Sequence, residues 1–415
     1  MEQYDFYFGI DLGSTSHAVC CVDHLGKVIE RKSFRHSPEA LTDLIGWILS
    51  HAEPAQMAMS IEVPRGAIVD TLLERGVDVY SINPKQVDRF RDRYSVAGCK
   101  DDDRDAFVLA DTLRTDTSLY RRVLADDPRI IQLREATRME DELEKSMRVL
   151  SNRLWSSLNR VIPQLLEISP GADDRWLWTL LAHTKGDLKS LRKFTKARIG
   201  SVLKKHRIRK VTSSEVQKHL KAGTLTLVDG TVDAVGRTID MLVAQLKVLD
   251  DQLKANKQYI DKILHGLETD TGKMNEHSDA KIILSFKGIG NKIAARMLSE
   301  ASQLLAERNY KALRVHSGVA PVTKRSGKTK LISIRKACNV RLRLAVHHWA
   351  GVAVLHDDRA KLHYARQRQK GNSHSRALRS VGDHLLRRLT AMLEKREIYR
   401  NEPIIDQVLT GQKRA

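Results

Sequence analysis

Four carboxylates and one serine are the residues of this chain best suited to chemistry. The acids are Asp11, Glu62, Asp102 and Asp105, and the serine is Ser326, which lies in a stretch dense with Lys and Arg. The chain has a formal net charge of +20, which suits a polyanionic partner. Such a partner repels carboxylates unless divalent metal ions lie between them. Acids that could hold metal in a basic chain therefore indicate phosphodiester chemistry.

The local sequence suggests how the four acids could come together. Asp11 closes a predicted strand rich in aromatic and β-branched residues, and Glu62 lies near the end of another. Asp102 and Asp105 are three residues apart in a predicted helix, which puts them on one face. Two Mg²⁺ ions about 4 Å apart would neutralise these acids and hold the attacking and leaving oxygens of a phosphodiester.

Simpler explanations of the acids stay open on spacing alone. Carboxylates in the first turn of a helix are stabilised by the helix dipole, which would explain Asp102 and Asp105 without metal. Glu62 could be an ordinary surface residue of a strand. The run of three acids at 101–103 also leaves the assignment open by one position.

Length and composition limit the number of domains and the kind of partner that this chain can have. With 415 residues the chain is too long for one core, so two or three domains are expected. Lys and Arg number 71 against 51 Asp and Glu, and neutralising phosphates with such an excess releases counterions, so nucleic acid is the predicted partner. A merely basic protein without that partner is the alternative.

The cysteines and the apolar pattern bear on the compartment. The four cysteines have no paired spacing that suits a zinc site or a secreted disulfide framework. The first residues do not resemble a signal peptide, and no apolar run approaches the roughly 18 residues that cross a bilayer. We expect a soluble cytoplasmic protein with no membrane segment.

The first part of the chain predicts an α/β domain that ends near residue 125. Strands are expected over 4–11, 18–23, 28–34, 57–63 and 77–82, and helices over 38–51, 67–75 and beyond Pro84. Three strands followed by alternating helix and strand indicate a mixed sheet. This is the order expected of a ribonuclease-H-like fold.

The middle of the chain predicts long helices. One is expected over 131–166, and another carries an apolar seam in steps of three and four over 232–267, interrupted by Asn256. That seam is typical of a coiled coil in which the Asn amide fixes register. It could join two copies of the chain or pack on the 131–166 helix, and we favour the first. Between them, the one-sided basic run at 185–210 suggests a nucleic-acid contact over a solvated helix face.

The last third predicts a helix, a glycine turn and a second helix around 284–294, and then a helical, basic segment to about residue 395. The turn could expose backbone N–H groups to a phosphate at the start of the second helix. A plain helix-turn-helix packing element is the alternative. The predicted nucleic-acid contacts are Lys287, Gly288, Gly290, Lys292, Arg325, Lys328, Lys336 and Arg343.

These segments contain a set of short motifs. The motifs are Gly9-Ile10-Asp11, Glu62, Asn83-Pro84, Lys100-Asp101-Asp102-Asp103-Arg104-Asp105-Ala106, Lys287-Gly288-Ile289-Gly290, Ser317-Gly318-Val319-Ala320-Pro321, Ser326-Gly327 and Ile334-x-Lys336-x-x-Asn339-x-x-Leu342-Arg343. Over nearly its whole length the chain resembles the DEDD transposases of the insertion-sequence one-ten family. It departs from the family pattern at 63–65, at Asp101 and at Cys338, but no predicted catalytic group is replaced.

The resemblance implies a DNA transposase or recombinase of a mobile element. It implies a resolvase-like domain over 1–125 whose four acids bind Mg²⁺ or Mn²⁺, a helical linker with the basic segment and coiled coil over 126–275, a C-terminal transposase domain over 276–400 and a tail over 401–415. Ser326 would be the nucleophile. DNA, a structured guide RNA and further copies of the chain, as a dimer or tetramer, would be partners, in a prokaryotic cytoplasm and at the nucleoid during activity.

Three alternatives to this function and its nucleophile stay open. Residues 9–15 also resemble the phosphate loop of actin-like or sugar-kinase ATPases, although no second Asp-x-Gly hairpin follows. A non-catalytic nucleic-acid-binding scaffold would explain the charge. Without the resemblance, Ser326 would be read as a loop serine in a Ser-Gly turn, and Ser317 and Ser333 are other possible nucleophiles.

Overall fold

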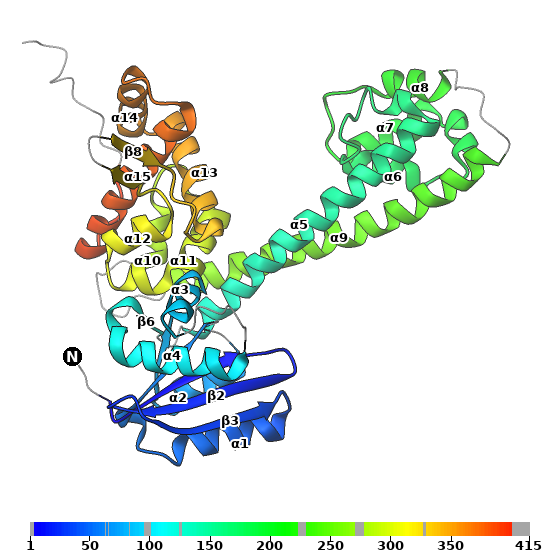
Figure 1. Ribbon diagram of the computed structural model, residues 1–415. Coiled ribbons are helices and arrows are strands. Elements are labelled where there is room, and N and C mark those ends of the chain that lie inside the picture. Colours follow the sequence, from blue (N-terminus) through cyan, green and yellow to red (C-terminus); the bar gives the residue numbers. More distant parts are fainter. Residues whose placement is uncertain are drawn as a thin grey trace, which may run out of the picture. The chain divides into compact units, whose positions relative to one another are not determined.

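The computed structural model describes residues 4–62, 64, 66–82, 84–94, 101–123, 127–222, 230–269, 278–326 and 329–400 (Figure 1), without the side chains of 84, 85, 324, 329 and 330. The chain divides into two compact units, Met1–Asp127 and Pro128–Ala415. The predicted division of the second unit into linker, C-terminal domain and tail stays a prediction. In the described part of the chain, no helix is both long and apolar enough to cross a membrane.

The first unit is built on a mixed sheet, as predicted. Its strands are β1 (Phe6–Leu12), β2 (Ser16–Asp23), β3 (Val28–Arg35), β4 (Met57–Ile61), β5 (Asp78–Ser81) and β6 (Arg121–Arg122), in the spatial order β3-β2-β1-β4-β5-β6. β1 is antiparallel to β2 and parallel to β4, which is parallel to β5. The helices are α1 (Pro38–Leu49), α2 (Ala67–Glu74), α3 (Pro84–Tyr94) and α4 (Asp102–Asp116).

Alternation along the central strands gives each face of the sheet its own core. Phe8 and Ile10 of β1 join the cluster that includes buried residues of α1 and α2, whereas Tyr7 joins the cluster of α4. Gly9 also faces α4, because a Cβ there would lie 2.0 Å from the carbonyl oxygen of Ala106. Since side chains alternate along a strand, Asp11 belongs to this α4 face as well.

In the residues that the structure describes, the second unit is helical apart from one hairpin. Its helices are α5 (Pro128–Val161), α6 (Arg175–Ala182), α7 (Lys196–Lys205), α8 (Ser213–Lys221), α9 (Thr231–Thr269), α10 (Asp279–Leu284), α11 (Asn291–Ala306), α12 (Tyr310–His316), α13 (Val340–His356), α14 (Asp358–Gln369) and α15 (His374–Lys395). The long helices α5 and α9 run alongside each other (Figure 1). One apolar core gathers α6, α7 and α8 around them, and another gathers α10 to α15.

The predicted apolar seam of 232–267 packs against α5 of the same chain. Its members Ile239, Leu246 and Leu253 are buried, and the Asn256 amide nitrogen donates a hydrogen bond to the backbone oxygen of Ala136 at 2.9 Å. Within one chain the seam therefore packs as the second of the two predicted arrangements, and association of two copies stays a prediction. An intramolecular helix pair buries the same stripe without a second copy, because both arrangements need only an apolar partner helix.

A correction concerns the segment around the serine. The sequence indicated helix, but β7 (Val322–Ser326) and β8 (Thr329–Ser333) form an antiparallel hairpin in which Ser326 is opposite Thr329. β-Branched residues such as Val322, Thr323 and Ile332 favour strands. The many Lys and Arg residues of this segment led to the prediction of a basic helix, although its β-branched residues favour strands.

Candidate functional site

Asp11 and Glu62 lie at the ends of neighbouring parallel strands. The register pairs Gly9 with Ser60 and Ile10 with Ile61, so Asp11 of β1 and Glu62, which directly follows β4, come next at the same edge. Both side chains are half-buried. Parallel strands end at one edge of a sheet, which is how two acids far apart in sequence become neighbours.

The first turn of α4 supplies the other two acids. Asp101 is its N-cap, and its carboxylate accepts a hydrogen bond from the backbone N–H of Asp103. Asp102 is the first helical residue and is exposed, whereas Asp105, one turn later, is only 2% exposed. Burial raises the pKa of the Cys20 thiol on β2, the charge and hydrogen bond of Arg31 lower it, and the charge of Asp103 raises it. Capping by Asp101 and helical spacing together favour Asp102 as the partner of Asp105.

Arg91 of α3 contacts this acidic group, and the sequence had not pointed to it. Its Nε and Nη2 atoms donate to the two carboxylate oxygens of Asp105 at 2.6 and 2.8 Å. Its Nη1 donates to Asp88 at 2.5 Å. Burial lowers the pKa of Arg91, but the hydrogen bond and charge of Asp105 and the charges of Asp88 and Glu62 outweigh it, so the pKa is raised. Arg91 thus lies within electrostatic reach of two of the four predicted metal ligands.

The donor chemistry of this group fits a divalent metal ion, since carboxylate oxygens are the ligands that Mg²⁺ and Mn²⁺ prefer. Within the residues that the structure describes, no three His, Cys, Asp or Glu side chains are arranged closely enough to hold a metal ion. The guanidinium of Arg91 occupies both oxygens of Asp105. Each oxygen of Asp105 thus accepts a hydrogen bond from this one side chain.

The structure separates the three serines considered as nucleophiles. Ser326 is the exposed last residue of β7. Ser317 is fully buried, and its hydroxyl donates to the backbone oxygen of Arg314 at 3.4 Å. Ser333, at the end of β8, is half-buried. Exposure favours Ser326, which belongs to the second unit, whereas the four acids belong to the first.

The other predicted nucleic-acid contacts have mixed surroundings. Lys287, Arg325 and Lys336 are exposed, and Lys328 lies outside the described residues. Arg343 is half-buried, with one guanidinium nitrogen 3.7 Å from the sulfur of Cys338.

The glycine turn between α10 and α11 packs closely on α13. Gly288 has φ +88°, and a Cβ there would lie 3.0 Å from the backbone nitrogen of Ala353. The Trp349 indole donates to the backbone oxygen of Lys287 at 3.2 Å. Gly290 is the N-cap of α11. The turn therefore has a packing role whether or not it also contacts a phosphate.

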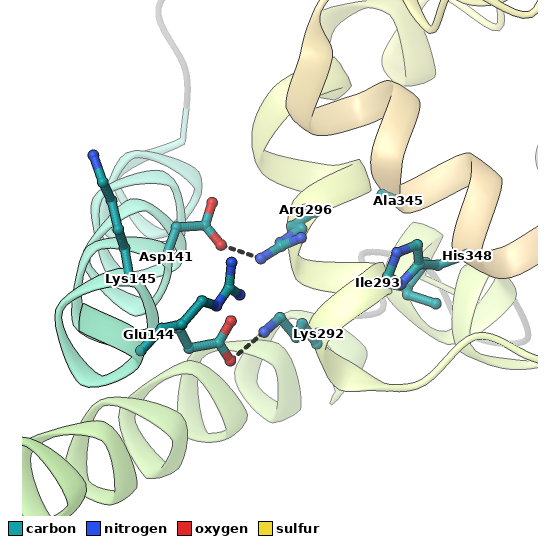
Figure 2. A pocket seen from close by; sticks show the side chains of 9 residues that line it. Asp141, Glu144, Lys145, Lys292, Ile293, Arg296, Ala345 and His348 are labelled. Atoms are coloured by element: carbon teal, nitrogen blue, oxygen red, sulfur yellow. Dashed lines mark hydrogen bonds and ion pairs between the residues drawn. The ribbon is translucent and has the colours of Figure 1, made fainter. Parts of the chain in front are cut away.

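Lys292 lies in a cleft of about 440 Å³ lined by α5, α11 and α13. Figure 2 shows it paired with Glu144, at 2.5 Å, and Arg296 paired with Asp141. Two acids of α5 thus match two cations of α11. Lys145 and Arg148 also line the cleft and are exposed; within the described residues neither forms an ion pair. Lys145 and Arg148 were not predicted from the sequence as functional residues, because both lie in a helix in which acidic and basic residues alternate.

The predicted basic run of 185–210 includes a short 3₁₀ turn at Leu188–Lys193 and the helix α7, and several of its cations have partners. Lys189 and Lys210 are paired with Asp233 and Asp174, at 3.4 and 3.1 Å. Arg198 stacks on Phe194, with its guanidinium carbon 4.1 Å from the ring centroid.

Lys205 acts on a cation of another helix. Burial lowers the pKa of Lys247 in α9, the charge of Lys205 lowers it further, and the charge of Asp240 only partly offsets this. Neither lysine contacts a carboxylate in the described part of the chain. We call Arg198 and Lys205 of α7, together with Lys247 of α9, the tip cations.

Comparison with known proteins gives two family matches. Residues 8–163 match a DEDD transposase family of the IS110 type. Residues 280–365 match a family described as transposase IS116/IS110/IS902. The two matches cover the acidic site and most of the segment that carries Ser326.

Individual relatives are similar over most of the chain. The candidate transposase y4uE of Sinorhizobium fredii is 39% identical over 222 residues, which are 53% of this chain and 62% of that protein. The candidate transposase of the IS117 mini-circle from Streptomyces coelicolor is 27% identical over 94% of both chains. A protein of insertion element IS110 from the same organism is 23% identical over 96% of both.

Proposed function

Because the chain belongs to the IS110 family of insertion-element transposases, we propose that it cuts and rejoins the DNA ends of such an element by a metal-dependent reaction with a serine nucleophile. The observation that supports this most directly is that Asp11 and Glu62 follow paired residues of the parallel strands β1 and β4, while Arg91 is acted on by the charges of both Asp105 and Glu62. The strand order β3-β2-β1-β4-β5 supports a ribonuclease-H-like fold for the first unit.

The four acids would hold Mg²⁺ or Mn²⁺, which when bound neutralises the charge of a phosphodiester and stabilises the charge that develops during its cleavage. The sheet would hold both strand acids in place, because Asp11 lies in β1 opposite Ala18 of β2 and Glu62 directly follows β4. Asp102 and Asp105 are oriented by the first turn of α4. The carboxylates thus come from elements of one sheet and its covering helix, which keeps their separation independent of loop motion.

Ser326 would attack DNA from the β7–β8 hairpin. Its Oγ forms a bond to phosphorus, one P–O bond of the strand breaks, and the leaving deoxyribose oxygen takes a proton. The hydroxyl is a weak nucleophile at its ordinary pKa and needs activation by the acidic site. Exposed Arg325 is the neighbouring cation that would hold the backbone.

Strand cleavage and covalent linkage test this proposal. Asp11→Ala, Glu62→Gln and Ser326→Ala should each reduce recombination between element ends by at least about a hundred-fold, since removing a nucleophile or a metal ligand removes stabilisation of the transition state. Ser333→Ala is the matched control and should retain activity. Mass spectrometry of a trapped complex should find a phosphoserine–DNA linkage at Ser326. An adduct on another residue, or full activity of Ser326→Ala, would reject the serine mechanism.

Family membership favours a transposase over the two other functions considered. An actin-like or sugar-kinase ATPase would hydrolyse nucleotide, and that activity would survive Glu62→Gln. A non-catalytic scaffold would leave recombination unchanged by Asp11→Ala. The two variants therefore separate all three functions in one set of assays.

Partners other than DNA remain part of the proposal. A structured guide RNA and a dimer or tetramer of the chain follow from the family resemblance, in a prokaryotic cytoplasm at the nucleoid. The seam of α9 is covered by α5 within one chain, so self-association would use another surface. Analysis of RNA that co-purifies with the protein tests the guide RNA. The mass of the protein in solution, measured by light scattering, tests the dimer or tetramer.

A further inference from the structure

We infer that Arg91 is a positioning residue that holds the Asp105 carboxylate until a divalent metal ion displaces it. This inference rests on the proposed function, in which Asp105 is one of four metal ligands. It adds a residue that belongs to no motif of the sequence and gives it a defined action on the site.

Burial explains why Asp105 needs a cation at all times. The side chain is 2% exposed, and a buried carboxylate without a partner is strongly unfavourable. Arg91 supplies both the opposite charge and two parallel hydrogen bonds, at 2.6 and 2.8 Å. A planar guanidinium matches a carboxylate in this two-point manner, which a lysine cannot do.

A metal ion and Arg91 compete for the same carboxylate. A divalent cation binds carboxylate oxygen at about 2.0–2.1 Å for Mg²⁺, and both Asp105 oxygens already accept from Arg91. Two cations at one carboxylate repel each other strongly in a poorly solvated site. Glu62 adds its charge to the attraction of Arg91, so a metal ion would weaken the hold of Arg91 through Glu62 as well as Asp105.

Asp88 and solvent can still accept hydrogen bonds from the Arg91 guanidinium after it leaves Asp105. Its Nη1 already donates to Asp88, one turn earlier on α3, at 2.5 Å, and the Asp88 side chain is 64% exposed. The Arg91 side chain is itself 27% exposed. Rotation away from Asp105 therefore leaves the guanidinium paired and partly hydrated, which keeps the displacement from creating a buried unpaired charge.

A purely structural role, as a tie between α3 and α4, is the alternative. Other contacts already join these helices. Arg93 pairs with Asp116 at 2.9 Å, and the Tyr94 hydroxyl donates to Asp111 at 2.6 Å. Arg93 is thus a natural control, because it joins the same two helices at the end away from the acids.

The test measures Mn²⁺ binding to the full-length protein by calorimetry and electron paramagnetic resonance, without any activity assay. Arg91→Gln should bind Mn²⁺ about ten-fold or more tightly than the unaltered chain, since a charged hydrogen-bonding competitor has been removed. Arg93→Gln should leave the affinity unchanged. Equal or weaker Mn²⁺ binding by a folded Arg91→Gln protein would overturn the inference and leave Arg91 a structural residue.

A second substitution, at the exposed residue Asp88, tests the same exchange without removing Arg91. Asp88→Asn deprives Arg91 of its alternative partner and should weaken Mn²⁺ binding several-fold. In the Arg91→Gln background the same change should have no effect, and a persistent effect would show that Asp88 acts on the metal by itself. If neither the unaltered chain nor Arg91→Gln shows any bound Mn²⁺, the proposed metal site fails, which is a different result from equal, measurable affinities in the two proteins.

Discussion

At the scale of single residues, Gly9 decides how closely α4 approaches the sheet. A Cβ at this position would lie 2.0 Å from the backbone oxygen of Ala106 and 2.5 Å from the backbone nitrogen of Ala110. Both atoms are helix backbone, which cannot move away as a flexible side chain could. The helix would have to shift as a unit, and it carries Asp105.

Gly9→Ala is therefore expected to destabilise the protein by at least about 2–3 kcal/mol, as overpacking against backbone does. Chemical denaturation measures this loss. Gly46→Ala in α1 is the control, because a Cβ there meets nothing within 4 Å, and replacing a helix-interior glycine should stabilise by roughly 0.5–1 kcal/mol. Similar stability changes in the two variants would mean that α4 does not pack on β1 as described.

The residue scale also shows where prediction from sequence stops. Asp11 and Glu62 could be predicted as site residues because the end of a strand is visible in its composition. Arg91 could not, since its partner Asp105 lies beyond residues 95–100 and α3 is so rich in charge that it reads as a solvated helix. Only the fold reveals which of its cations faces inward.

At the scale of elements, the long helices were predictable but their partner was not. Apolar steps of three and four fix one face of α9, and this face is the same whether the partner helix belongs to one chain or two. The hairpin of β7 and β8 was missed for another reason. Its strands have five residues each, too short for the alternation to stand out from the surrounding basic residues.

Asn256 tests the packing of α9 on α5. Its amide bonds to the backbone oxygen of Ala136, which as part of a helix already accepts one hydrogen bond. Asn256→Leu therefore leaves no acceptor unpaired and should raise the stability by about 1 kcal/mol, as apolar residues do at such seam positions. Asn256→Ala should lower it, because it loses both the bond and the packing.

Thermal denaturation distinguishes these outcomes, and light scattering shows whether the assembly state changes. Marked destabilisation by Asn256→Leu would mean that the amide makes a contact that a hydrocarbon cannot replace. An altered mass of the assembly would mean that Asn256 also determines which helix packs against α9.

At the scale of the whole molecule, composition predicted the class of partner but not the cations that meet it. The net charge of +20 counts every Lys and Arg equally. In the structure Lys292 and Lys210 are matched by acids, whereas two of the tip cations, Lys205 and Lys247, repel each other. An unmatched cluster loses this repulsion when phosphates approach, so its members contribute more to binding than paired cations do.

The tip cations should therefore carry part of the affinity for nucleic acid. Lys205→Gln with Lys247→Gln should weaken binding by about ten-fold at moderate salt and reduce the slope of log affinity against log salt by about two, since each phosphate contact contributes about 0.9. The control, Lys189→Gln with Lys210→Gln, removes the same charge from residues already paired with Asp233 and Asp174. It should change the affinity and the slope much less. Fluorescence anisotropy with a DNA duplex and with an RNA hairpin, each over a range of salt, measures both quantities and shows which nucleic acid depends on the tip. Equal losses in the two double variants would mean that net charge alone, and not the unmatched cluster, determines binding there.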